Sequence, residues 1–296
     1  MVLTGMIWIL LPNKADRLAE KKTGESDMGM REYASKKVNV LGIDVSVMRP
    51  EKAVNLTMEY MRKQGLETIF FLSAEASLFC QNQPWAAELV RGCRLVLTGD
   101  KTTELAVSHR HSEGESADGI GKFADEYLKR LFWKLNREGR EIYAVVEKQE
   151  HFDTFREYME SSYPDIVLQG IVYEGKTKGE PDKVVNEING NIPDIVFFCL
   201  PVEQQLLFVK EYSSMMNTRL CICIESLWSL IRKETVEVPS ILRLLHLDSI
   251  WYEMGREPTL RKVIAGSIFK KRVMGDVAQA PEKEEKTERE EDFPEE

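Results

Sequence analysis

The sequence predicts an α/β protein with a Rossmann-like fold: an open, mostly parallel sheet with helices on both faces, followed by a C-terminal helical appendage. Seven short apolar runs, rich in β-branched and aromatic residues, alternate with longer amphipathic segments. Continuous apolar strands of this kind are typical of a parallel sheet that is buried on both faces. The runs are VNVLG (38–42), TIFFLS (68–73), RLVLT (94–98), EIYAVV (141–146), IVLQGI (166–171), DIVFFCL (194–200) and RLCICIE (219–225).

The segments between these runs carry helical signals. Residues 121–138 place aromatic and leucine side chains at helical spacing before Gly139, which predicts a helix that ends at this glycine. Pro50 suits the first position of another helix, which we expect to run to about Gln64. In open sheets of this kind ligands bind at the carboxyl ends of the strands, so chemistry is expected where strands run into loops.

The chain divides into four predicted parts. Residues 1–37 form an N-terminal arm that we expect to be poorly ordered, because residues 13–37 are polar and rich in charge. The apolar run at 6–12 is too short to span a bilayer and lacks the features of a secretory signal. Residues 38–239 form the α/β domain. Residues 240–275 form a basic amphipathic helical appendage, and residues 276–296 form an acidic tail that we expect to be disordered.

Composition supports a folded domain and disfavours nucleic acid as a partner. With 296 residues, of which 43% are hydrophobic, the chain can build a large core. Its formal charge of −9 is concentrated in residues 281–296, where nine acidic side chains stand against three basic ones. The sequence pI of about 5.3, with basic residues confined to one segment, is unlike that of a nucleic-acid-binding protein.

No motif in the sequence indicates a metal, a dinucleotide or a P-loop phosphate site. The five cysteines form no CxxC pair, which favours a reduced, cytosolic interior, and the four histidines show no metal-ligand spacing. Neither GxGxxG after the first run nor GxxxxGK[ST] is present. The glycines of DGIGKF (118–123) could present backbone N–H groups to a phosphate, or could simply form a flexible start to a helix.

The C-terminal appendage allows two interpretations. Between Ser240 and Val273, seven Lys and Arg residues stand against three acidic ones, with aromatic and aliphatic residues among them. Such a segment can lie at a membrane interface, with its cations near anionic lipid headgroups. Alternatively, it forms a helical pair that docks on the sheet domain.

Four stretches in order carry a resemblance to a known family. They are VLGIDVSVMRPEKAV (40–54), YMESSYPDIVLQGIVYEG (158–175), IPDIVFFCLP (192–201) and WYEMGREPTLRK (251–262). In order and spacing they resemble the WecG/TagA/CpsF glycosyltransferases over roughly residues 38–272. Members of that family transfer a hexosamine-type sugar from a UDP-sugar to a lipid-linked acceptor on the cytoplasmic face of bacterial membranes.

The chain departs from this family at its hallmark motifs. The family's T-x-N, P-D-G, R-V-x-G and P-K-Q-E correspond here to Ser73-Ala74-Glu75, Thr98-Gly99-Asp100, Ser116-Ala117-Asp118-Gly119 and Pro201-Val202-Glu203-Gln204. The family aspartate is proposed to deprotonate the acceptor hydroxyl, and here a carboxylate stands one residue later in the chain. Two cations expected near a nucleotide-sugar site are absent from these motifs.

Each of these polar residues also has a purely structural interpretation. Asp100 could cap a helix that begins at Lys101, with Glu104 nearby to support its first turn. Glu203 and Gln204 could be first-turn residues that the helix dipole favours.

The resemblance implies an inverting glycosyltransferase that uses a UDP-hexosamine and a polyprenyl-diphosphate-linked acceptor in bacterial cell-envelope or capsule polysaccharide synthesis. Asp100 is the expected catalytic base. No D-x-D sequence is present, so we expect no required metal, and we expect no cofactor. The expected substrate-binding residues are Ser73, Glu75, Thr98, Gly99, Gly119, Glu203, Gln204 and Arg261.

The same resemblance implies a cytoplasmic protein, peripheral at the inner face of the plasma membrane. Its expected partners are the UDP-sugar donor, the lipid-linked acceptor and an anionic membrane surface that residues 240–275 would contact, with Arg256 or Arg261 brought towards it. The sequence leaves open whether the protein forms a homo-oligomer. The competing hypothesis is a catalytically degenerate homologue that acts as a binding or scaffolding subunit, because several hallmarks are altered together.

Overall fold

The computed structural model describes residues 36–111, 122–177, 179–225, 227, 231 and 260–278. Gly119, Arg256 and residues 240–259 of the predicted appendage lie outside these residues, as do residues 1–35 of the expected N-terminal arm and residues 279–296 of the expected acidic tail. Lys36 and Lys37 of the arm belong to strand β1 (Lys36–Val40), and residues 276–278 of the tail belong to helix α13 (Leu260–Ala278).

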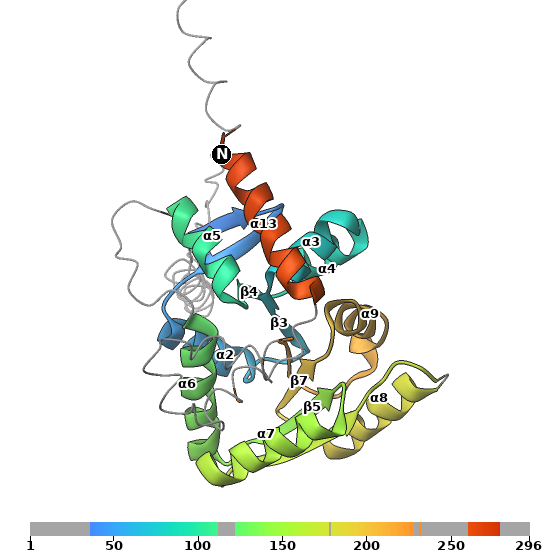
Figure 1. Cartoon of the computed structure of the whole chain (residues 1–296). Helices are drawn as coiled ribbons and strands as arrows, with labels where there is room; N and C mark the ends of the chain where they lie inside the picture. Colours follow the sequence, from blue (N-terminus) through green and yellow to red (C-terminus); the bar gives the residue numbers. More distant parts are fainter. Residues whose placement is uncertain are drawn as a thin grey trace, which may run out of the picture. The chain divides into compact units, whose positions relative to one another are not determined.

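A six-stranded parallel sheet, with helices around it, organises the described residues (Figure 1). Its strand order is β4-β3-β8-β7-β5-β6. The register places Phe70 of β3 beside Val96 of β4 on one side and Cys223 of β8 on the other. Since every pairing in this sheet is parallel, the carboxyl ends of all six strands lie along one edge. The strands are β3 (Glu67–Leu72), β4 (Leu95–Thr98), β5 (Glu141–Val146), β6 (Val167–Val172), β7 (Ile195–Cys199) and β8 (Leu220–Cys223).

Helices cover both faces of the sheet, each over its own hydrophobic core. One face carries α3 (Ala74–Asn82), α4 (Pro84–Gly92), α5 (Lys101–His111), α8 (Glu180–Asn191) and α9 (Val202–Tyr212). The other face carries α2 (Pro50–Tyr60), α6 (Phe123–Glu138) and α7 (Gln149–Ser162). A short 3-10 helix, η1 (Ser213–Met215), follows α9. The predicted α/β, Rossmann-like fold is confirmed.

Helix α6 shows how the local sequence builds one of these layers. Its apolar side chains recur at helical spacing, and Phe132 packs against Phe155 of α7 and Phe197 of β7, with ring centroids 5.9 and 5.8 Å apart. The helix ends at Gly139, which adopts a left-handed conformation with φ of 58°. The helix predicted over 121–138 is therefore present and begins at Phe123.

The first predicted strand, 38–42, is the one run that does not join the main sheet. It forms a separate two-stranded sheet, in which β1 (Lys36–Val40) pairs with β2 (Ile43–Val47). The intervening Leu41 and Gly42 both have positive φ, 51° and 86°, which is the conformation that a two-residue hairpin turn requires. The hairpin lies against edge strand β4 and helix α4.

Helix α13 (Leu260–Ala278) packs against α3 and α5 (Figure 1). Ala265, Phe269 and Val273 are buried in this contact, and Phe269 is fully buried. The described part of the predicted appendage therefore packs on the α/β domain, and the second helix of the expected pair falls outside the described residues. No helix in the described part of the chain is long and apolar enough to cross a membrane.

Candidate active site

Three polar side chains follow the carboxyl ends of three neighbouring strands. Ser73 follows β3, Asp100 follows β4, and Glu225 follows β8, which pairs with β3 on the side opposite to β4. Parallel pairing therefore brings residues that are far apart in sequence to one edge of the sheet. The sequence predicted Ser73 and Asp100 as site residues and missed Glu225, although this glutamate ends the last predicted strand.

Asp100 holds the starts of two helices. Its Oδ1 accepts a hydrogen bond from the backbone N–H of Thr103 at 2.7 Å, which is the N-cap bond of α5. Its Oδ2 accepts from the backbone N–H of Ala74, the first residue of α3, at 2.8 Å. The predicted capping role of Asp100 is thus confirmed, and the aspartate additionally links α5 to α3.

The surroundings of Asp100 make its carboxyl less acidic. Burial raises the pKa of the Asp100 carboxyl above its ordinary value, the hydrogen bonds from Ala74 and Thr103 lower it, and the negative charge of Glu225 raises it. The net direction is upward. A carboxylate with a raised pKa is a stronger base, which is the property that general-base catalysis needs.

Ser73 connects the start of α3 to Glu225. Its Oγ caps α3 by accepting from the backbone N–H of Ala76 at 3.0 Å, and the same hydroxyl donates to Glu225 Oε2 at 3.3 Å. Ser73 Oγ therefore uses its proton and one lone pair within the protein, and one lone pair remains for a further donor.

Gly99 allows β4 to approach β3 closely just before Asp100. Its N–H donates to the Leu72 carbonyl at 2.8 Å, and a Cβ at this position would lie 3.0 Å from backbone atoms of Phe71. Thr98, the last residue of β4, is buried and pairs with Leu72. These two residues shape the backbone that places Asp100 beside α3.

Of the remaining predicted residues, three lie in the first turns of α3 and α9, and two have no described side chain. Glu75 lies half-buried in the first turn of α3, and Glu203 and Gln204 lie in the first turn of α9. Helix α9 follows β7, the strand next to β8, so its start lies at the same edge of the sheet. Arg261 belongs to α13, but its side chain and the whole of Gly119 are outside the described residues.

Two glutamines at the start of α9 have buried amide atoms that bind nothing in the described structure. Oε1 of Gln204, and both Oε1 and Nε2 of the fully buried Gln205, have no hydrogen-bond partner among the described residues. Buried amides are nearly always paired, so these atoms are exceptional. Gln204 is among the site residues predicted from the sequence, and Gln205 is not.

Glu104, in the first turn of α5, makes a contact that the sequence did not predict. This buried carboxylate accepts a hydrogen bond from the backbone N–H of Phe123 at 2.8 Å. It thereby ties α5 to the start of α6. Among the described side chains no three His, Cys, Asp or Glu residues form a group that could hold a metal ion.

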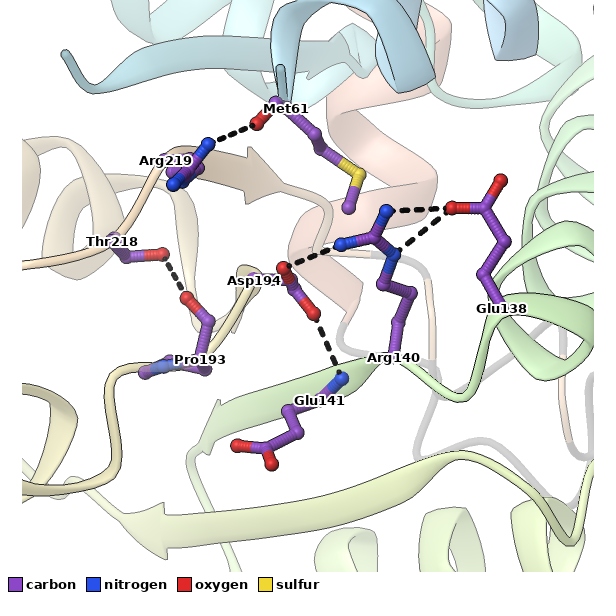
Figure 2. A network of polar contacts seen from close by, with 8 residues as sticks. All are labelled: Met61, Glu138, Arg140, Glu141, Pro193, Asp194, Thr218 and Arg219. Atoms are coloured by element: carbon purple, nitrogen blue, oxygen red, sulfur yellow. Dashed lines mark hydrogen bonds and ion pairs between the residues drawn. The ribbon is translucent and has the colours of Figure 1, made fainter. Parts of the chain in front are cut away.

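The opposite edge of the sheet is held by a polar network (Figure 2). Arg140 pairs with Glu138 at 2.7 Å and with Asp194 at 3.1 Å, and Asp194 also accepts from the backbone N–H of Glu141 at 3.1 Å. These contacts fix the amino ends of β5 and β7 to each other. The aspartate of IPDIVFFCLP is therefore a structural residue, remote from the carboxyl ends of the strands.

Comparison with known proteins agrees with this arrangement. The family model described as "Glycosyl transferase WecG/TagA/CpsF family" matches residues 38–280, which include the whole parallel sheet and α13. No individual curated protein matches the chain. With four fifths of its length matched by the family model, the chain belongs to the WecG/TagA/CpsF family of glycosyl transferases.

Proposed function

We propose that this protein transfers a hexosamine-type sugar from a UDP-sugar to a polyprenyl-diphosphate-linked acceptor during bacterial cell-envelope or capsule polysaccharide synthesis. Family membership supports glycosyl transfer in polysaccharide synthesis. The observation that carries the assignment within this chain is the position of Asp100, a half-buried carboxylate with a raised pKa at the carboxyl end of β4.

Asp100 is the proposed general base. Each oxygen of an ionised carboxylate can accept two hydrogen bonds, so the bonds from Ala74 and Thr103 leave room for an acceptor hydroxyl. The hydroxyl oxygen attacks the anomeric carbon of the donor while its proton passes to Asp100. The bond between that carbon and the UDP oxygen breaks in the same step, UDP leaves, and the configuration inverts.

We propose that the donor lies between the starts of α3 and α9, which begin at the same edge of the sheet. Helix starts favour bound phosphate groups, and we assign this role to α9, because the Ala74 and Ala76 N–H groups of α3 already bind Asp100 and Ser73. Residues of these two first turns would contact the donor, while Thr98 and Gly99 shape the adjoining backbone. The proposed donor-binding set is Ser73, Glu75, Glu203 and Gln204, with Gly119 and Arg261 retained from the sequence.

The second candidate function is a binding or scaffolding subunit without activity. One observation favours it: both oxygens of Asp100 already bind backbone N–H groups, so selection for helix capping alone would preserve this aspartate. An enzyme would lose its turnover when the Asp100 carboxylate is removed, whereas a scaffolding subunit would show no turnover with or without it.

UDP release from purified full-length protein, with UDP-N-acetylhexosamines and a polyprenyl-diphosphate-linked sugar acceptor, tests the proposal. Asp100→Asn should lower the rate by at least about 100-fold, a typical contribution of a general base. Thr103→Ala is the matched control, because it removes the hydroxyl that bonds the Asp100 backbone carbonyl at 2.9 Å and keeps the carboxylate. Equal losses in the two variants, or turnover that survives in Asp100→Asn, would contradict the catalytic role.

We also propose that the protein works at the cytoplasmic face of the plasma membrane. Helix α13 supports this: Ile264 and Ile268, one turn apart, are 53% and 41% exposed, and Lys270, Lys271 and Arg272 are exposed after them. Exposed isoleucines beside clustered cations suit an anionic lipid surface.

Flotation of the full-length protein with phosphatidylglycerol vesicles tests this second proposal. Ile264→Ser combined with Ile268→Ser should reduce the floated fraction. Trp133→Ser should not, although Trp133 on α6 is also 53% exposed. Failure of the unaltered protein to float, or an equal reduction in the control, would contradict the assignment of α13.

A further inference from the structure

Two carboxylates hold the first turn of α3 from its two sides. Asp100, from the end of β4, accepts from the Ala74 N–H at 2.8 Å. Glu225, from the end of β8, accepts from the Ser73 hydroxyl at 3.3 Å. Ser73 and Ala74 are consecutive residues, so the two acids are connected through one peptide unit. Because β3 lies between β4 and β8, the strand order itself produces this arrangement.

Ser73 contacts both Glu225 and the start of helix α3. Its Oγ accepts from the Ala76 N–H at 3.0 Å, and its backbone carbonyl accepts from the N–H and the hydroxyl of Ser77, both at 2.9 Å. A hydroxyl that donates to Glu225 must present a lone pair to the helix start, so the glutamate selects the capping orientation of Ser73. The same helix start supplies the N–H that fixes Oδ2 of Asp100.

Among the described residues, charged side chains stand on the segments that meet at Asp100. Glu225 faces it from the end of β8 and raises its pKa, an effect smaller than that of burial. Helix α3 contributes Glu75 in its first turn, and α5 contributes the exposed Lys101 and the buried Glu104. The Glu104 carboxylate also accepts from the backbone N–H of Phe123 at the start of α6.

We propose that Glu225 is a positioning residue of the transfer reaction: it orients the Ser73 hydroxyl and holds its own carboxylate beside that of Asp100. This role rests on the proposed function and adds a residue that the hallmark motifs do not contain. Glu225 acts through Ser73 and Asp100 and contacts neither the acceptor nor the donor.

Two substitutions of Glu225 distinguish the effect of its charge from the effect of its contact with Ser73. Glu225→Gln keeps an oxygen that can accept from Ser73 and removes the charge, whereas Glu225→Asp keeps the charge and shortens the side chain. Glu88→Gln, on the exposed face of α4, removes the same charge at a remote position and is the control.

Two measurements are made on the full-length protein across pH. The first is the rate of UDP release, resolved into kcat and KM for the donor. The second is the titration of the Asp100 carboxyl by carbon-13 NMR, with the resonance assigned from its absence in Asp100→Asn. The NMR titration does not require turnover, so it reports on the charge coupling even in an inactive protein.

Glu225→Gln should lower kcat several-fold, leave KM for the donor unchanged, and move both the acidic limb of the rate profile and the NMR midpoint of Asp100 to lower pH. Glu225→Asp should retain the midpoints of the unaltered protein, as should Glu88→Gln. If the unaltered protein turns over and Glu225→Gln leaves both midpoints in place, the role of Glu225 is refuted and the proposed function stands. If the unaltered protein releases no UDP, both are refuted, even where the NMR midpoint moves.

Discussion

Replacement of Gln205 by methionine should stabilise this protein. Gln205 is fully buried in α9, and neither its amide oxygen nor its amide nitrogen has a partner among the described residues. An unpaired buried polar group costs about 1–3 kcal/mol. Methionine has a similar unbranched shape without the amide, so Gln205→Met should raise the free energy of unfolding by about 1–3 kcal/mol.

Urea denaturation followed by circular dichroism measures this change, with an unchanged m value as the sign that the two states are otherwise the same. For a domain of this size each kcal/mol should also raise Tm by about 2–4 °C. Gln64→Met makes the same exchange at an exposed glutamine and should stay within about 0.5 kcal/mol of the unaltered protein. A Gln205→Met variant that is less stable by more than about 1 kcal/mol would show that the amide is satisfied in the folded protein, and the reasoning would be wrong.

Three further changes test the packing. Ile192→Gly should stabilise the protein by about 0.5–1 kcal/mol in urea denaturation, because this exposed isoleucine ends α8 with a φ of 48° that glycine adopts without strain; a loss of stability would contradict this. Thr57→Val should cost about 1–3 kcal/mol, since it removes the 2.8 Å partner of the buried Tyr127 hydroxyl, and adding Tyr127→Phe should restore most of the loss. Phe269→Ala should weaken the docking of α13 by about 3–5 kcal/mol and speed tryptic cleavage within this helix, whereas unchanged cleavage would show that Phe269 does not hold it.

Most of the sheet could be predicted because each buried parallel strand is a continuous apolar run, which is visible in the local sequence. The run at 38–42 was misassigned because its apolar content resembles that of the other strands. The alternation of Val38 and Val40, then Ile43 and Val45, around Leu41-Gly42 carried the hairpin signal.

The candidate site was predictable only in part, because strand ends can be located in the local sequence whereas the order of the strands in the sheet cannot. Ser73 and Asp100 stand at the ends of consecutive predicted strands, and both lie where the strand ends placed them. Glu225 was not found because its proximity to Ser73 depends on β8 lying beside β3, and strand order is not encoded in any one segment. Gln205 was missed because a polar residue in a helix is ordinarily expected at the surface.

The position of β8 in the sheet constrains how this chain can be made. Its first paired residue, Leu220, lies beside Glu67, about 150 residues earlier in the sequence. A ribosome that adds 5–20 residues per second needs roughly 8–30 s to reach β8 after it has completed β3. Strand β7 is completed only about 20 residues before β8 begins, and until β8 is made β3 and β7 lack the strand that separates them, so the two halves of the sheet cannot join. Shortening the chain before β8 would therefore leave two incomplete sheets with unpaired inner edges, and the hydroxyl of Ser73 would never meet Glu225.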